Sequence, residues 1–236
     1  MMRLSDAVNK IARLARPVLC LDTCIYLDIL RSSASAQQIL NVLERYEKLL
    51  AQDAFIPIAP SIIAQEYARN VEHVTNSIRK SIDKTVKEWN GLLPLMSVVS
   101  GSAAIPTMDR TVAMKAIDHL NAKSESLLHA ALPIEPDSQI ESSVSRRQSM
   151  SIRPAKRGKD SFGDCMICET VLALTAALRS IGFGQDVYLV TSNKEDFGDE
   201  RPGMQGRAHP DLVRDFATNS ISYEPVLAAM LWRAFP

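Results

Sequence analysis

Four acidic residues stand where a fold could bring their carboxylates together around a divalent cation. Asp22 directly follows the apolar run 17–21, Glu66 lies early in a predicted helix, Asp164 opens another helix, and Asp196 follows a late strand. Carboxylates that converge on one edge of a sheet repel one another unless cations lie between them. Carboxylate oxygens are also the ligands that hard cations such as Mg²⁺ prefer. The pattern therefore predicts a divalent-metal site.

The elements that must position these acids alternate between strands and helices. Apolar and β-branched runs predict strands at 17–21, 55–59, 187–191 and 221–223. Helical spacing of apolar residues predicts helices over 3–15, 24–31, 35–52, 61–93, 109–131, 161–181, 210–218 and 225–235. Such alternation favours an α/β fold, a three-layer α/β/α sandwich with a central, mostly parallel sheet. Ligands of such sheets bind at the carboxyl ends of the strands, which is where Asp22 and Asp196 stand.

Residues 133–159 interrupt this alternation with Pro, Ser, Gln and charge, and we expect a flexible insertion there. The chain otherwise reads as a single domain over 1–236 with extra helices at about 70–131. The insertion is acidic first and then basic, with Arg146, Arg147, Arg153, Lys156, Arg157 and Lys159. These six side chains either contact the phosphate backbone of a nucleic acid without reading bases, or form a solvated loop that balances the nearby acids.

Each acid also has a purely structural interpretation. Asp22 could cap the helix that follows it, and Glu66 could pair with Arg69. Asp164 fits a capping box with Ser161. The same residue also extends a buried stripe backward along its helix, which points it toward the strand ends. That stripe consists of Ile167, Val171, Leu174, Leu178 and Ile181.

Composition narrows the setting. The 27 basic and 27 acidic residues cancel, so any field that attracts nucleic acid must be local. The N-terminus lacks the apolar core of a secretory signal, and no apolar run reaches membrane-spanning length, so we expect a cytoplasmic protein without membrane contact. The four cysteines are interpreted as buried free thiols, with a four-thiolate zinc site as the alternative: Cys20, Cys24, Cys165 and Cys168.

In order and content, these motifs resemble the PIN domain, a family of metal-dependent nucleases that includes the toxin ribonucleases of bacterial toxin–antitoxin pairs. The matching stretches, which suggest a longer subgroup of the family, are 18–24, 60–66, 163–170 and 188–197. The resemblance implies that Asp22, Glu66 and Asp164 are the catalytic, metal-binding acids of a PIN-like, Rossmann-like fold. A fourth acid often follows the Thr of the late strand, but this chain has Asn193 there, and Asp196 is three residues later.

The function that the resemblance implies is hydrolysis of RNA phosphodiester bonds by an endoribonuclease with Mg²⁺ or Mn²⁺ as cofactor. Thr23, Thr191 and Ser192 would position water or phosphate, and Asn193 or Asp196 would supply an oxygen ligand. The expected partners are RNA, an antitoxin or another protein, and a second copy in a homodimer. One alternative is an inactive PIN-like module that binds RNA or protein. Another is a haloacid-dehalogenase-type phosphatase, which needs an aspartate where Cys24 stands.

Overall fold

A parallel sheet forms the centre of the computed structural model, which describes residues 2–31, 36–100 and 105–236. Within these residues the sheet has six strands in the order β1-β4-β3-β2-β5-β6, and every neighbouring pair is parallel. The strands are β1 Met2–Arg3, β2 Val18–Leu21, β3 Ile56–Pro60, β4 Leu132–Glu135, β5 Val187–Val190 and β6 Ile221–Glu224. The prediction of an α/β fold with a mostly parallel sheet is confirmed.

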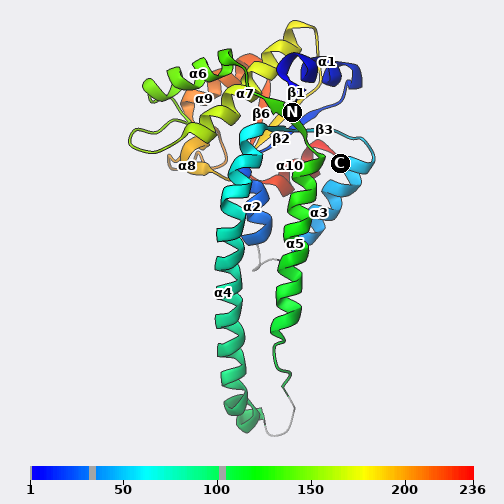
Figure 1. Ribbon diagram of the computed structural model, residues 1–236, viewed down its shortest axis with the longest axis vertical. Coiled ribbons are helices and arrows are strands. Elements are labelled where there is room, and N and C mark those ends of the chain that lie inside the picture. Colours follow the sequence, from blue (N-terminus) through cyan, green and yellow to red (C-terminus); the bar gives the residue numbers. More distant parts are fainter. Residues whose placement is uncertain (1, 32–35, 101–104) are drawn as a thin grey trace.

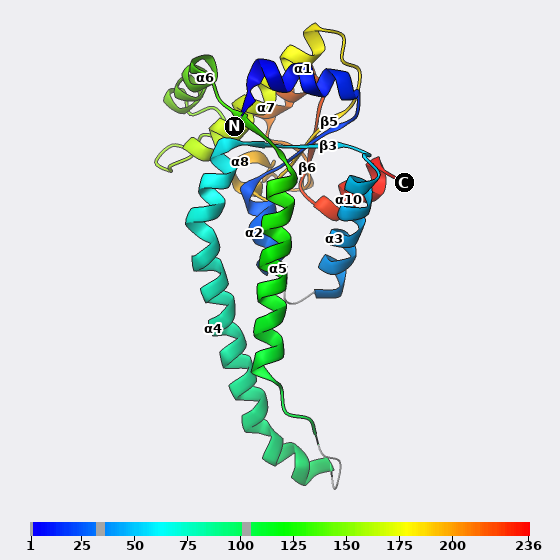
Figure 2. The ribbon, with the colours of Figure 1, turned by 45° about the vertical axis from the view of Figure 1, so that its right-hand side comes forward.

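Helices cover both faces of this sheet, as Figure 2 shows. One face carries α1 (Leu4–Leu14) and α7 (Phe162–Ser180), and α6 (Ser138–Ser149) and α9 (Pro210–Asn219) pack against α7. The other face carries α2 (Thr23–Arg31), α3 (Ala36–Ala51) and α10 (Leu227–Ala234). Because every strand runs the same way, all carboxyl ends lie on one edge, where the chain passes into α2, α4 and α8.

Two long helices form a hairpin that projects from the sheet and its covering helices (Figure 1). Helix α4 (Ser61–Ser100) begins directly at the end of β3, and α5 (Arg110–Ala130) returns beside it. Near the sheet both helices pack against α2, and the ion pair between Arg79 and Asp118 (2.7 Å) joins them farther out. None of the described helices combines the length and apolar character needed to cross a membrane.

Residues 133–159 are not the flexible insertion that their composition predicts, because they contain most of a strand and a whole helix. Strand β4 pairs with β3 on one side and β1 on the other. The Asp137 side chain starts α6 by accepting hydrogen bonds from the backbone N–H groups of Gln139 and Ile140, both 3.0 Å long. Buried Ile140 and Val144 then anchor α6 on α7. Arg147 is the third buried residue of this otherwise polar helix.

Candidate metal centre

Asp22 lies at the middle of the carboxyl edge of the sheet. It directly follows β2, the strand between β3 and β5, and its backbone N–H donates to the Val190 carbonyl at 2.9 Å. Its side chain is only 3% exposed, and its Oδ2 accepts hydrogen bonds from the Thr191 hydroxyl and from the Cys24 thiol (3.2 Å). Asp22 is therefore a buried carboxylate that is held in place by donors from α2 and from the residue after β5.

Glu66 reaches the same edge from the second turn of α4. The Thr23 hydroxyl donates to Glu66 Oε2 at 2.7 Å, so the residue after Asp22 orients this carboxylate. Arg69, the structural alternative as a partner, instead donates to the carbonyl of Gln65. On the opposite side the carboxylate lies against Gly163, where a Cβ atom would stand only 1.7 Å from Glu66 Oε1. The missing side chain at Gly163 makes room for Glu66.

The substitution Gly163→Ala is expected to displace the Glu66 carboxylate while α7 stays folded. Alanine favours a helix over glycine by about 1 kcal/mol, which offsets part of the steric cost. We expect the affinity for Mn²⁺ to fall by about 10- to 100-fold, the effect of disturbing a supporting contact of a metal site. Isothermal titration with Mn²⁺ measures this change, and circular dichroism checks the fold. Gly91→Ala is the matched control, because no atom lies within 4 Å of the added Cβ. An unchanged affinity in Gly163→Ala would contradict the expectation.

Asp164 and Asp196 are joined by one side chain. Asn193 Nδ2 donates to Asp164 Oδ1 at 3.1 Å and to Asp196 Oδ2 at 3.0 Å. Asp196 lies in the short helix α8 (Lys194–Phe197), is fully buried, and has one carboxylate oxygen without a hydrogen bond. The Lys159 ammonium donates to its other oxygen. Asn193, at the position where the resemblance expects an acid, thus bridges the third acid and the fourth.

The capping box expected at the start of α7 is not formed. Ser161 makes no side-chain cap, and the Phe162 backbone N–H instead donates to Asp160 Oδ1 at 3.1 Å. The Asp164 carboxylate is therefore not used in capping. It stays available at the edge of the sheet, partly buried, with Asn193 as its hydrogen-bond donor.

The pKa values of three of these acids show that they share one electrostatic environment. Burial raises the pKa of Asp22, although hydrogen bonds from Thr191 and Cys24 offset part of the effect. Burial also raises the pKa of Glu66; the Thr23 hydrogen bond opposes this and the charge of Asp22 adds to it. Burial and the charges of Asp22, Asp196 and Glu66 together raise the pKa of Asp164 to about 7. Mutual repulsion of this kind is relieved by protons or by a cation.

The donor set fits a hard divalent cation, although it is not a ready-made cage. Among the residues that the structure describes, no three His, Cys, Asp or Glu side chains stand close enough together to hold a metal. The four acids nevertheless offer oxygen ligands only, one oxygen of Asp196 is buried without a hydrogen bond, and a lysine ammonium already occupies part of the cluster. Mg²⁺ and Mn²⁺ are the ions that such ligands suit. Asp22, Glu66, Asp164 and Asp196 are the residues that could hold one.

The hydroxyl groups expected to position water or phosphate are engaged with carboxylates. Thr23 donates to Glu66, and Thr191 donates to Asp22 while accepting from the Asn193 backbone N–H (3.0 Å). Ser192 donates to Asp28 of α2, a residue that the sequence did not single out. These three side chains thus orient acidic residues. Cys24 and Gly163 also contact these acids. In the sequence, only their position inside the stretches 18–24 and 163–170 indicated that they would lie beside the acids.

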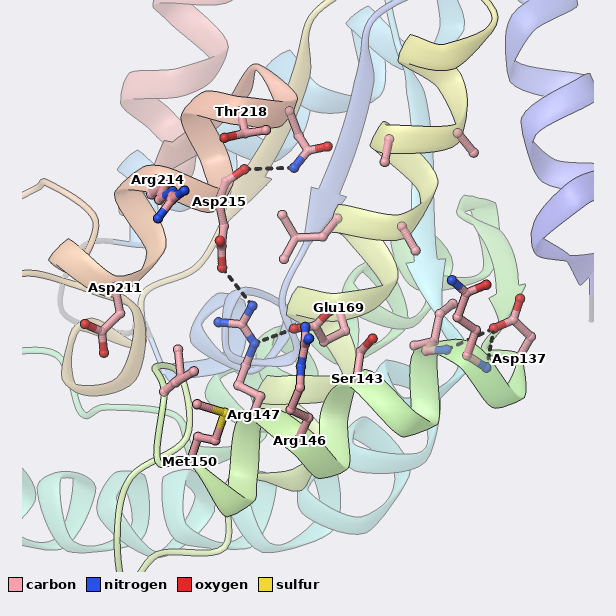
Figure 3. Close-up of a pocket in the computed structure, with 18 of the residues that line it drawn as sticks. Asp137, Ser143, Arg146, Arg147, Met150, Glu169, Asp211, Arg214, Asp215 and Thr218 are labelled. Atoms are coloured by element: carbon pink, nitrogen blue, oxygen red, sulfur yellow. Dashed lines mark hydrogen bonds and ion pairs between the residues drawn. The ribbon is translucent and has the colours of Figure 1, made fainter.

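Arg147 does not fit the predicted contact with a nucleic-acid backbone, because it is buried in an ion-pair network. Its guanidinium donates to Glu169, to Asp215 (2.8 Å) and to the carbonyl of Arg153. Figure 3 shows it between Glu169 of α7 and Asp215 of α9. Arg147 is buried, and its ion pairs link α6, on which it lies, to α7 through Glu169 and to α9 through Asp215. Removal of either member of a buried ion pair leaves a buried charge uncompensated. These three helices also border an open cavity of about 1270 Å³, and none of the four acids is among the described residues that line it.

The other five basic residues divide into two groups. Arg153 and Lys159 approach the acidic cluster, since the Arg153 guanidinium lies 3.7 Å from Asp196 Oδ1 and Lys159 donates to Asp196 Oδ2. Arg146, Lys156 and Arg157 are exposed. For these three the predicted contact with phosphates stays a prediction.

Comparison with known proteins identifies a family whose model covers the part of the chain that contains the four acids. A family model described as a PIN domain matches residues 19–197, which is more than half of the chain and includes all four acids. Neither a search of curated proteins nor a search of solved structures found a match. The family match confirms the resemblance drawn from the order of the motifs.

Proposed function

The chain belongs to the PIN-domain family, whose members are mostly metal-dependent nucleases, and from this membership and its acidic cluster we propose that it is an endoribonuclease. Asp22, Glu66 and Asp164 would hold a Mg²⁺ or Mn²⁺ ion, and Asp196 would complete the set. The proposal depends most on one observation, which is that Asn193 joins Asp164 and Asp196 by hydrogen bonds at the sheet edge where the buried Asp22 lies. The raised pKa of Asp164, caused by burial and by the charges of Asp22, Asp196 and Glu66, agrees with this arrangement. Perturbed acids that cluster at a sheet edge are typical of functional sites.

Each side chain of the cluster has a definite part in this proposal. A bound cation supplies positive charge for the phosphate and a water of lowered pKa. Thr23 and Thr191 keep the carboxylates of Glu66 and Asp22 oriented, as their hydrogen bonds indicate. Asn193 keeps Asp164 and Asp196 together in spite of their like charges.

RNA reaches this cluster most readily past the basic segment that precedes α7. Lys159 and Arg153 already lie at Asp196, and Lys156 and Arg157 are exposed on the same segment. Contacts between such cations and phosphates do not distinguish one base from another. We therefore expect this segment to contribute little base preference to cleavage.

Cleavage of end-labelled RNA is expected to require Mn²⁺ or Mg²⁺ and to stop in excess chelator. Glu66→Gln should lower the initial rate of cleavage by at least about 100-fold, because it removes one of the negatively charged carboxylates proposed to hold the metal ion that stabilises charge on the phosphate. The matched control is Glu72→Gln, an exposed residue farther along α4 that should cleave like the wild type. A parallel assay with DNA of the same sequence tests whether cleavage is specific for RNA. Cleavage that persists in chelator or in Glu66→Gln would refute the proposal.

A second candidate is a PIN-like module that binds RNA without cleaving it. It is favoured by Asn193, an amide where the family often has an acid, and by the Lys159 ammonium at Asp196. A gel-shift assay in the same buffers separates the two functions. RNA that is retarded but remains intact at every metal concentration would favour the binding module.

A further inference from the structure

The far end of the helical hairpin carries an apolar surface that nothing in the described chain covers. The tip patch, as it is called below, comprises large side chains between 38% and 82% exposed: Leu92, Leu95, Val98, Val99, Met108 and Val112. Figures 1 and 2 both place this end of α4 and α5 far from the sheet. The segment that returns to α5 is fixed there, because Trp89 donates to the Pro106 carbonyl (3.2 Å) and Asn90 accepts from the Met108 backbone N–H (3.0 Å).

Helix α4 has two different apolar faces at this level. Leu93 and Met96 are partly buried. Leu92, Leu95 and Val99 recur at spacings of three and four on a second, exposed face. A hairpin that packs against itself only is expected to have one apolar face on each helix, and that face is buried between the two helices. The second face marks a helix that has a further partner to bury it.

The segment that carries five of the six residues of the tip patch, all except Val112, has no charged residue. From Trp89 to Met108 it contains no Asp, Glu, Lys, Arg or His, although charged residues make up 23% of the chain. The solvated surface of a globular protein normally carries charged side chains of both signs. Contact with nucleic acid would require cations here. The chemistry that fits this surface is therefore another uncharged, apolar surface.

The size of the tip patch matches what a stable dimer needs. A large apolar side chain exposes on the order of 100 Å² when free, so six of them at these exposures present about 400 Å². An area of this size is comparable to the largest apolar patch of a typical monomer, roughly 300–600 Å², and such patches are often functional. A standard interface buries roughly 800 Å² per partner, a little more than half of it apolar. The patch supplies that apolar half, and the polar surface of the two helices beside it supplies the remainder.

We propose that the tip patch is the contact surface between two copies of this chain, which associate through the ends of their hairpins. A second copy offers the same uncharged surface, so no charge has to be desolvated without a partner. A two-fold axis would place each patch on its equivalent and close the assembly at a dimer. Two hairpins side by side form the four-helix arrangement in which exposed apolar seams are buried.

This contact leaves the metal centre free. Glu66 and Val99 are 33 positions apart on α4, which at ~1.5 Å per residue is about 50 Å. Dimerisation through the tips therefore needs no residue of the acidic cluster, and its test is independent of whether the protein cleaves RNA.

Sedimentation velocity and light scattering of the full chain are expected to give the mass of a dimer at concentrations up to about 100 μM, with dissociation on dilution. The double variant Leu95→Asp/Val99→Asp should be a monomer throughout this range, and Leu95→Gln should weaken association at least about tenfold. The matched control Val213→Asp changes an exposed apolar residue of α9, away from the tip, and should remain a dimer. Circular dichroism confirms that all variants are folded.

Three results would overturn the proposal. The first is a monomeric wild type at about 100 μM. The second is a dimer that persists in Leu95→Asp/Val99→Asp. The third is a monomeric protein that floats with vesicles of phosphatidylcholine and phosphatidylglycerol but loses this binding in the double variant. That outcome would assign the patch to a lipid surface.

Discussion

Asp22→Asn is expected to abolish metal-dependent cleavage and at the same time to stabilise the metal-free protein. Asp22 is almost completely buried, and burial is the largest cause of its raised pKa. Asparagine has the same shape and can still accept the Thr191 hydrogen bond, but it carries no charge to desolvate. We expect the free energy of unfolding to rise by about 1–2 kcal/mol, which is roughly 2–8 °C in Tm for a chain of this size. The rate of cleavage should fall by at least about 1000-fold.

Thermal unfolding without Mn²⁺ measures the expected gain in stability, and thermal unfolding with Mn²⁺ measures the expected loss of metal binding. A ligand that binds only the folded state stabilises it by about 2.7 kcal/mol at 100 times its Kd, so Mn²⁺ should raise the Tm of the wild type and leave Asp22→Asn unchanged. The matched control is Asp53→Asn, because the Asp53 side chain is 69% exposed and pairs with Arg16 at the surface. A variant less stable than the metal-free wild type would show that Asp22 is held mainly for structure.

Raising the pH from about 5 to 8 is expected to weaken the metal-free fold and to strengthen Mn²⁺ binding. The pKa of Asp164 is raised from 3.8 to about 7, so between these values the folded protein holds a proton that the unfolded chain has lost. The free energy of unfolding therefore falls as the pH rises through this window and levels off above about 7. Full ionisation corresponds to a loss on the order of 2–4 kcal/mol. Asp22 and Glu66, whose pKa values are also raised, act in the same direction.

Metal binding shows the opposite trend because Mn²⁺ competes with this proton. For one group with a pKa of about 7, the apparent affinity should increase about tenfold between pH 6 and pH 8. Calorimetric titrations in buffers of different ionisation enthalpy count the protons that are released. Asp164→Asn should bind Mn²⁺ weakly and lose the part of the pH dependence of stability that Asp164 contributes, while the parts due to Asp22 and Glu66 remain. If the pH profiles of the wild type and Asp164→Asn coincide, Asp164 is not the group that titrates.

The fold could be predicted where burial leaves a periodic pattern in the sequence. Ile167, Val171, Leu174 and Leu178 are all fully buried, and the same stripe led to Asp164. Ile181, the last member of the predicted stripe, is exposed because α7 ends at Ser180. Long elements such as α4 and α7 contain enough turns for such a pattern to be read.

Short elements and long-range pairs could not be predicted in this way. Strand β4 has four residues and contains Pro133, so it shows neither alternation nor a strong β composition, and only its pairing with β1 and β3 defines it. Arg147 resembles its basic neighbours in sequence. Its burial depends on Glu169 and Asp215, which lie 22 and 68 positions away. Local composition carries no information about such partners.

The order of the strands determines when the acidic cluster can assemble during translation. Strand β2, which Asp22 directly follows, lies between β3 and β5, and both β5 and Asp196 come much later in the sequence than β2 and β3. During synthesis β2 therefore pairs with β3 first and gains its second neighbour only after β5 has left the ribosome. A nascent chain that stops before β5 lacks both the Thr191 hydroxyl that donates to Asp22 and the Asn193 amide that joins Asp164 to Asp196, so the acidic cluster is assembled only after both halves of the sheet have been synthesised.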